Sequence, residues 1–288
     1  MPRPAFQAAV WRLSFLALPL VACRKAPVQA PVAHEFVDDS SVGIPVGVFQ
    51  MGAPWETDGQ VHLVKVSAFF MAETEVTWGE WKAVYDWALQ HGYDFKNPGA
   101  GSYKDRPVYE VSWFDAVKWC NAKSEMAGRK PCYYQDNTFQ SASVYRSGDL
   151  LLDAKMVDWS ADGYRLPTEA EWEKAARGKD QGLRFPNGET LSKEEANFSS
   201  AGPKSVRSYP ANGYGLYDMA GNVMEWCWDG YVKGYSEQLE DPLGVGKAPQ
   251  KVVRGGGWMN KAEGCRVSYR GSLKPDHAGD GGFRWVRR

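Results

Sequence analysis

Several features are scarce in this sequence, and each scarcity excludes a class of protein. The 34 Lys and Arg nearly balance the 35 Asp and Glu, so no basic field favours nucleic acid as a partner. The 4 histidines form no pair at helical spacing, and no two cysteines stand as C-x-x-C, so the common short metal motifs are missing. The apolar run of residues 13–22 is too short to span a bilayer as a helix.

What the sequence does have is the composition of a globular protein, 43% hydrophobic, with 13 Trp, 14 Tyr and 30 Gly. This mixture favours a loop-rich fold in which flat rings pack the core and glycines allow tight turns. A carbohydrate-binding surface is the alternative interpretation of the aromatic residues.

The N-terminal segment is predicted to lie outside the fold. Residues 1–22 carry Arg3 and Arg12 ahead of the apolar run, which is typical of a signal peptide. The run ends in L-V-A-C, which resembles a bacterial lipoprotein box and implies that Cys23 carries the lipid. A simple signal peptide cut nearby is the alternative. Because Arg24 rather than Asp follows, the resemblance implies an outer-membrane lipoprotein, facing the periplasm or the surface. Residues 23–41 are expected to hold the lipidated cysteine and a flexible tether.

Residues 42–288 are predicted to form one continuous domain. Alternation predicts strands over residues 46–51 and 61–70. Thr77 is expected to cap a helix over 78–89, and Ser112 and Asp115 to open another that stops near Gly128. Thr168 and Glu171 form a capping box for the clearest helix. Capping and the helix dipole explain the acidic residues of its first turn without a catalytic role. The domain has an even number of cysteines, Cys120, Cys132, Cys227 and Cys265, so two disulfides are possible in an oxidising compartment, with the pairing open.

Four stretches in this order identify a family: E-T-E-V-T (73–77), G-Y-R-L-P-T-E-A-E-W-E (163–173), N-G-Y-G-L-Y-D-M-A-G-N-V-M-E-W (212–226), and R-G-G-G-W (254–258) with terminal G-F-R (282–284). They resemble the formylglycine-generating enzyme, or sulfatase-modifying factor, family over about residues 42–288. The resemblance implies an α+β, C-type-lectin-like fold with little regular secondary structure. It also implies that the C-terminal segment lines a ligand pocket.

The family's copper chemistry needs two cysteine thiolates within reach of each other, because soft thiolates suit copper(I). Counting back from Arg270 places the two positions on Ala262 and Val267, whereas counting forward from Arg254 places them on Cys265 and Arg270. At most one thiol is present either way, so copper is not expected. The iron-dependent branch of the fold uses a histidine cluster that His34, His62, His91 and His277 do not form; His277 alone lies in the pocket segment.

The stretch D-M-A-G-N-V-M-E (218–225) resembles the family's calcium site. The resemblance implies that the side chains of Asp218 and Glu225 and the carbonyls of Gly221 and Val223 are Ca²⁺ ligands, which fits the preference of a hard cation for oxygen. A plain acidic turn is the alternative.

The C-terminal segment also resembles that of diversity-generating retroelement variable proteins, in which a fixed scaffold displays varied ligand-binding residues. An ordinary solvated loop is the alternative interpretation. The resemblance implies the following ligand-binding residues: Trp258, Met259, Asn260, Lys261, Glu263, Lys274, Asp276, His277 and Asp280.

These observations together predict a lipid-anchored, non-catalytic envelope protein that binds a protein or small molecule and no nucleic acid, with the membrane as its second partner. The rival hypothesis is a formylglycine-generating oxidoreductase with Cys265 as its sole candidate catalytic thiol; a disulfide between Cys227 and Cys265 would remove that thiol. A regulatory partner for an envelope secretion or signalling system is a third possibility.

Overall fold

The computed structural model describes residues 1–2, 40–57, 61–180, 182–235 and 237–288. Residues 3–22 of the predicted signal peptide, Cys23 and nearly all of the tether therefore lie outside the described residues. Residues 36–288 belong to one compact unit. None of the helices in the described part of the chain has the length and apolar character needed to cross a membrane.

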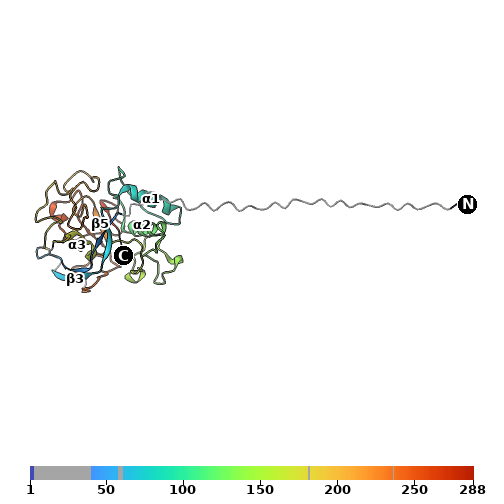
Figure 1. Cartoon of the computed structure of the whole chain (residues 1–288), viewed down its shortest axis with the longest axis horizontal. Coiled ribbons are helices and arrows are strands. Elements are labelled where there is room, and N and C mark those ends of the chain that lie inside the picture. Colours follow the sequence, from blue (N-terminus) through green and yellow to red (C-terminus); the bar gives the residue numbers. More distant parts are fainter. Residues whose placement is uncertain (3–39, 58–60, 181, 236) are drawn as a thin grey trace. The chain divides into compact units, whose positions relative to one another are not determined.

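Three α-helices have the capping residues that the sequence predicts. In α1 (Trp78–Leu89) the Thr77 side chain accepts a hydrogen bond from the Glu80 N–H, and in α2 (Trp113–Met126) Ser112 and Asp115 form a capping box. A second capping box, of Thr168 and Glu171, begins α3 (Glu169–Arg177). The helices lie in two places in Figure 1, with α1 packed on α2 and α3 against strands β2 (Gly47–Met51) and β3 (His62–Val66).

The strands form three small sheets in the described part of the chain, in the orders β1-β4-β9, β2-β3 and β7-β6-β5-β8. All pairings are antiparallel except that of β5 with β8. The strands are β1 (Ser41–Ile44), β2 (Gly47–Met51), β3 (His62–Val66), β4 (Phe69–Ala72), β5 (Met224–Gly230), β6 (Lys251–Arg254), β7 (Gly271–Leu273), β8 (Gly281–Gly282) and β9 (Val286–Arg287). Three short 3-10 helices complete the fold: η1 (Ser141–Ser143), η2 (Ala154–Met156) and η3 (Ala262–Cys265).

Two strand predictions needed correction. The predicted strand 61–70 is two strands in different sheets, because Ser67 turns the chain: its N–H and Oγ both donate to the Asp241 carboxylate at 2.7 Å. Strand β1 was not predicted, and it begins at Ser41, the last residue of the predicted tether. Its four residues are too few for alternation to reveal, and pairing with β4 stabilises it.

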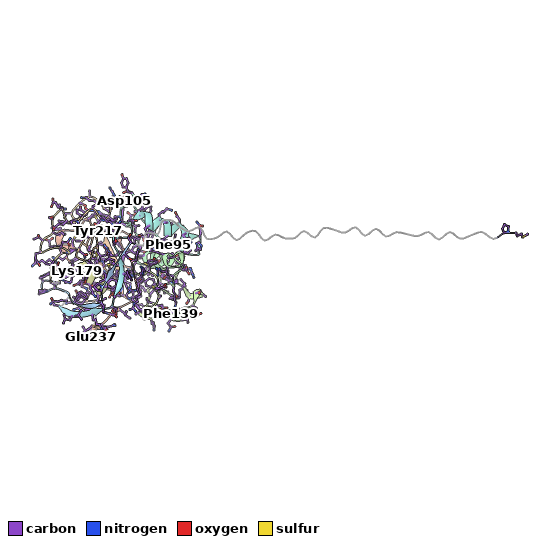
Figure 2. The ribbon with its side chains drawn as sticks, viewed as in Figure 1. Phe95, Asp105, Phe139, Lys179, Tyr217 and Glu237 are labelled. Atoms are coloured by element: carbon purple, nitrogen blue, oxygen red, sulfur yellow. The ribbon has the colours of Figure 1, made fainter. Side chains whose placement is uncertain are left out.

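Tryptophans dominate the core. The largest fully buried side chains include Trp81, Trp113, Trp119, Trp172, Trp226, Trp228 and Trp285. Trp81 and Trp119 stack with ring centroids 6.0 Å apart, and Phe95, labelled in Figure 2, meets Trp81 edge-on at 5.8 Å. These rings therefore pack the interior, which confirms the packing interpretation for most of the tryptophans.

Candidate functional site

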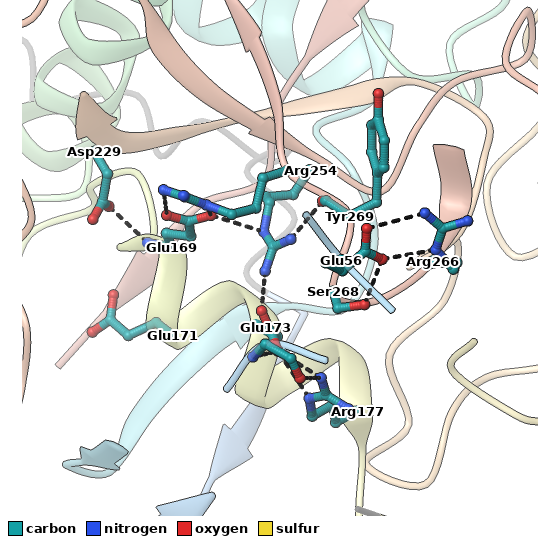
Figure 3. Close-up of polar contacts among 12 residues, drawn as sticks. Glu56, Glu169, Glu171, Glu173, Arg177, Asp229, Arg254, Arg266, Ser268 and Tyr269 are labelled. Atoms are coloured by element: carbon teal, nitrogen blue, oxygen red, sulfur yellow. Dashed lines mark hydrogen bonds and ion pairs between the residues drawn. The ribbon is translucent and has the colours of Figure 1, made fainter. Parts of the chain in front are cut away.

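Buried ion pairs fix the C-terminal segment to helix α3. Arg254, at the end of β6, forms a charged hydrogen bond with Glu173, and both side chains are completely buried. Arg270 binds the two carboxylate oxygens of Glu169 through Nε and Nη2 at 2.7 and 2.9 Å. Figure 3 shows these glutamates side by side on α3, facing the C-terminal segment. Bidentate arginine–carboxylate pairs of this kind hold both partners in one geometry.

Capping and the helix dipole were expected to account for Glu169 and Glu171 in the first turn of α3. That explanation is confirmed for Glu171, which caps the helix and also pairs with Arg165 at 2.6 Å. The sequence did not indicate that Glu169 and Glu173 point across the fold toward Arg270 and Arg254. Arg254 and Arg270 occupy positions of the family-like pattern, which marked them as candidates for a structural role. Their glutamate partners could not be identified, because they lie far away in the sequence.

A further ion pair ties the same segment to the start of the domain. Arg266 Nε and Nη2 donate to the Glu56 carboxylate at 2.7 and 3.0 Å, and Ser268 Oγ donates to it at 2.9 Å. The backbone between η3 and β7 is thus held by side chains on both sides, so the residues that protrude from it are displayed on a fixed frame.

The first part of the predicted binding surface runs from Trp258 to Glu263. Some of its side chains are held by the protein and others are exposed. Trp258 is buried, with its ring edge-on to Tyr109 at 5.2 Å. Asn260 is partly exposed; its Oδ1 accepts from the Gly257 N–H at 2.8 Å and its carbonyl from the Ser199 N–H at 2.8 Å. Met259 is 61% exposed. The remaining exposed residues of this part are Lys261 and Glu263.

The second part of the predicted surface holds Lys274, Asp276 and His277, which are exposed, and Asp280, which is half-buried. His277 Nε2 lies 3.9 Å from Asp280 Oδ1. The carbonyl of Gly279 accepts from the Glu110 N–H at 2.7 Å. Both parts of the surface therefore contact the same short segment, Tyr109 to Glu110, although about ten residues separate them in sequence.

Cys265 lies at the base of this frame with its sulfur inside the protein. The residue is 0% exposed and packs with Phe185, Ala196 and Phe198. Burial raises the pKa of the Cys265 thiol to about 12, so the reactive thiolate form is suppressed at neutral pH. Val267, one of the alternative family cysteine positions, is also fully buried.

The prediction of disulfides is wrong for this structure. Cys120, Cys132, Cys227 and Cys265 are all buried free thiols. The pair considered most closely, Cys227 with Cys265, does not form because the two residues belong to different parts of the core: Cys227 packs in the cluster around α3 and Cys265 in a separate small cluster. Buried ion pairs and aromatic packing, rather than disulfides, stabilise the loops.

The predicted calcium residues are close together but engaged with protein groups. Arg284 donates to the two oxygens of Glu225 at 2.6 and 2.8 Å, and Trp172 Nε1 donates to Oε2 of the same carboxylate at 2.6 Å. Asp218 Oδ2 accepts from the Arg207 N–H at 2.9 Å. In this arrangement the Arg284 guanidinium occupies the Glu225 oxygens that a calcium ion would take as ligands. Within the described ranges no group of three or more His, Cys, Asp or Glu is arranged to hold a metal.

Gly221 and Val223 supply backbone to the same turn. The Gly221 N–H donates to the Gly255 carbonyl at 2.8 Å, and the Val223 N–H donates to Glu75 Oε1 at 2.9 Å. Burial, followed by the charges of Asp218 and Glu225, raises the pKa of Glu75 well above its usual value. The turn is a buried acidic cluster around Arg284, and calcium binding stays a prediction from the sequence.

Comparisons with known proteins agree with this architecture. The family model for the sulfatase-modifying factor enzyme 1-like domain matches residues 28–288. The chain is 30% identical over 273 residues to chaperone protein LppX of Paenibacillus barcinonensis, covering 87% of this chain and 90% of that protein. It is 30% identical over 307 residues to the formylglycine-generating enzyme of Streptomyces coelicolor, covering 90% and 92%. The structure of Treponema denticola variable protein 1 superposes with a TM-score of 0.73 at 32% identity, covering 86% of this chain and 94% of that one.

Proposed function

The chain belongs to the sulfatase-modifying factor enzyme 1-like domain family, and we propose that it uses this fold as a non-catalytic binding scaffold anchored to the cell envelope by a lipid on Cys23. Fold membership alone does not decide activity, since function depends on the site. The observation that carries the proposal is the state of Cys265: a single, fully buried thiol whose pKa is raised to about 12.

The form of the C-terminal segment supports binding as its role. Arg254, Arg266 and Arg270 are each held by a carboxylate, so the backbone is fixed. Between Arg254 and Arg266, and again after Arg270, unlike side chains reach solvent on two stretches that border Tyr109 and Glu110. A rigid frame reduces the ordering cost of association, and loops on such a frame commonly carry recognition. We propose that a partner protein contacts Met259, His277 and their exposed neighbours.

Two relatives favour a protein partner over chemistry. One is named a chaperone and the other a variable protein, and neither name states an oxidase activity. The proposed anchor rests on the L-V-A-C sequence, and the proposed location is the outer membrane. Metabolic labelling with a palmitate analogue tests the anchor: the wild type should incorporate label and the Cys23→Ala variant should not.

Site-specific photo-crosslinking in living cells tests the binding surface. A photoreactive amino acid at position 259 or 277 should give discrete adducts with one partner. The matched control is position 63, because Leu63 is 63% exposed and Met259 61% exposed. Equal adducts from all three positions would contradict the proposal.

The rival oxidoreductase has its own test. The purified full chain is incubated with copper, oxygen and a sulfatase-type peptide that contains cysteine, and formylglycine is measured by mass spectrometry. We expect no conversion. Conversion that disappears in Cys265→Ser would overturn the non-catalytic proposal.

A further inference from the structure

A second recess lies outside the surface described above. It is a cleft of about 200 Å³, open to solvent, where the beginning of α3, the end of β5 and the segment after β5 meet. This volume is below that of a typical drug-sized pocket and suits a single alkyl chain or one long side chain. Its apolar wall includes Met51, Ala170, Val232, Tyr235, Pro242 and Val245. No residue of the predicted C-terminal binding surface lines it.

One carboxylate in this cleft has an oxygen that accepts no hydrogen bond from the described residues. Asp229, the penultimate residue of β5, is only 7% exposed. Its Oδ2 accepts from the Glu169 N–H, at the start of α3, at 2.7 Å, as Figure 3 shows. Its Oδ1 accepts no hydrogen bond from any residue that the structure describes. Oδ1 is not a fully buried atom, so it reaches the open cleft, where a ligand donor can take the place of water.

Gly244 keeps that oxygen accessible. The chain passes over Asp229 at Gly244, where φ is 61°, and a Cβ there would lie 2.0 Å from Oδ1. Any other residue would therefore press its side chain onto the carboxylate oxygen. The absence of a side chain at this position lets the chain pass close over Asp229 without displacing Oδ1 from the cleft that both residues line.

The positive groups beside the cleft are already used. Arg270 gives two hydrogen bonds to Glu169, and its Nη1 donates to the carbonyls of Val232 and Gly234 at 3.2 and 2.6 Å. Lys251 Nζ donates to the carbonyls of Trp228 and Gly246 and does not line the cleft. An anion would have to displace the hydrogen-bond partners of Arg270 and Lys251. A cation can instead donate to Asp229 Oδ1, which accepts no hydrogen bond from the described residues.

We propose that this cleft binds the ammonium end of a primary alkylamine, as a small molecule or as a side chain, with Asp229 Oδ1 as the acceptor and the apolar wall covering the carbon chain. A charge-assisted hydrogen bond in a largely buried site is about twice as strong as a neutral one, and the wall adds burial of methylene groups. The site is separate from the C-terminal surface, so the two proposals fail independently.

The proposal also predicts a pH dependence. Burial, and next the charge of Glu169, raise the pKa of Asp229 to about 7, against the opposing charges of Lys251 and Arg270. His62 also lines the cleft, together with Glu169 and Arg270. An ammonium binds the ionised carboxylate, so the affinity should increase between pH 6 and pH 8.

The test is an NMR titration of the full, ¹⁵N-labelled chain at pH 8 with n-hexylammonium, 1-hexanol and hexanoate. We expect saturable shifts from hexylammonium at the amides around Asp229 and Gly244, with weaker binding of hexanol and none of hexanoate. Asp229→Asn, which keeps an acceptor for the Glu169 N–H, should weaken hexylammonium binding at least ten-fold and remove its pH dependence. Asp276→Asn, on the C-terminal surface, is the matched control and should leave the binding unchanged.

Three results would overturn the proposal. They are the absence of saturable hexylammonium shifts at these amides, binding of hexanoate as tight as that of hexylammonium, and unchanged hexylammonium affinity in Asp229→Asn. Gly244→Ala gives a second check that does not alter charge. The added methyl group should block hexylammonium while the remaining spectrum keeps the dispersion of the folded protein.

Discussion

Arg254 and Glu173 form an ion pair with both side chains completely buried, one at the end of a β-strand and the other in the middle of helix α3. Removing Arg254 takes away one of two buried guanidinium partners of Glu173, which also pairs with Arg177 at 2.7 Å, and breaking a buried ion pair is strongly destabilising. We expect Arg254→Ala to lower the free energy of unfolding by about 3–5 kcal/mol, measured by urea denaturation.

The control for this experiment is Arg184→Ala, since Arg184 pairs with Glu189 on the surface with side chains 49% and 61% exposed. That substitution should change the free energy of unfolding by less than about 0.5 kcal/mol. Equal losses in both variants would show that the buried pair does not fix the C-terminal segment.

Cysteine alkylation tests the burial of Cys265. Iodoacetamide at pH 8 should leave Cys120, Cys132, Cys227 and Cys265 unmodified in the native protein, because the thiolate is the reactive form and all four thiols are buried. All four should react after unfolding in guanidinium, as read by peptide mass spectrometry. Rapid native modification of Cys265, or a disulfide-linked peptide before reduction, would contradict the structure.

Calcium binding at the Asp218–Glu225 turn requires Glu225 to exchange Arg284 for the ion. The sequence-based prediction then expects Ca²⁺ to raise the Tm of EDTA-treated protein, because a ligand that binds only the folded state stabilises it. Asp218→Asn should abolish the increase. An identical Tm in EDTA and in calcium would show that Arg284, without a bound ion, compensates the negative charge of the acidic cluster.

Stability should depend on the ionisation of Asp229. Its pKa in the folded protein is about 7, so the folded state keeps a proton that the unfolded chain loses near pH 4. The free energy of unfolding contributed by this group therefore falls as pH rises from about 4 to 7 and is constant above that. Urea denaturation at pH 5 and pH 7 should show a smaller fall in Asp229→Asn than in the wild type, while Asp276→Asn should match the wild type.

Local features of the fold were predictable because their causes are local. The caps at Thr77, Ser112 and Thr168 are short sequence patterns, and each begins the helix expected of it. The family-like motifs also predicted the α+β fold with little regular structure, which the family match and the superposed structure confirm. The errors fall where distant residues decide the outcome. Asp241 splits the predicted strand 61–70, and β1 depends on its pairing with β4.

The sequence by itself determined the family, the capped helices and the presence of a single cysteine where copper chemistry requires two. Only the tertiary structure decided that Cys265 is a buried free thiol, that Glu169 and Glu173 hold Arg270 and Arg254, and that Asp229 keeps an oxygen open beside Gly244. The physical reason is the range of the interactions. Capping acts within one helical turn, whereas burial and ion pairing depend on which distant segments the fold brings into contact.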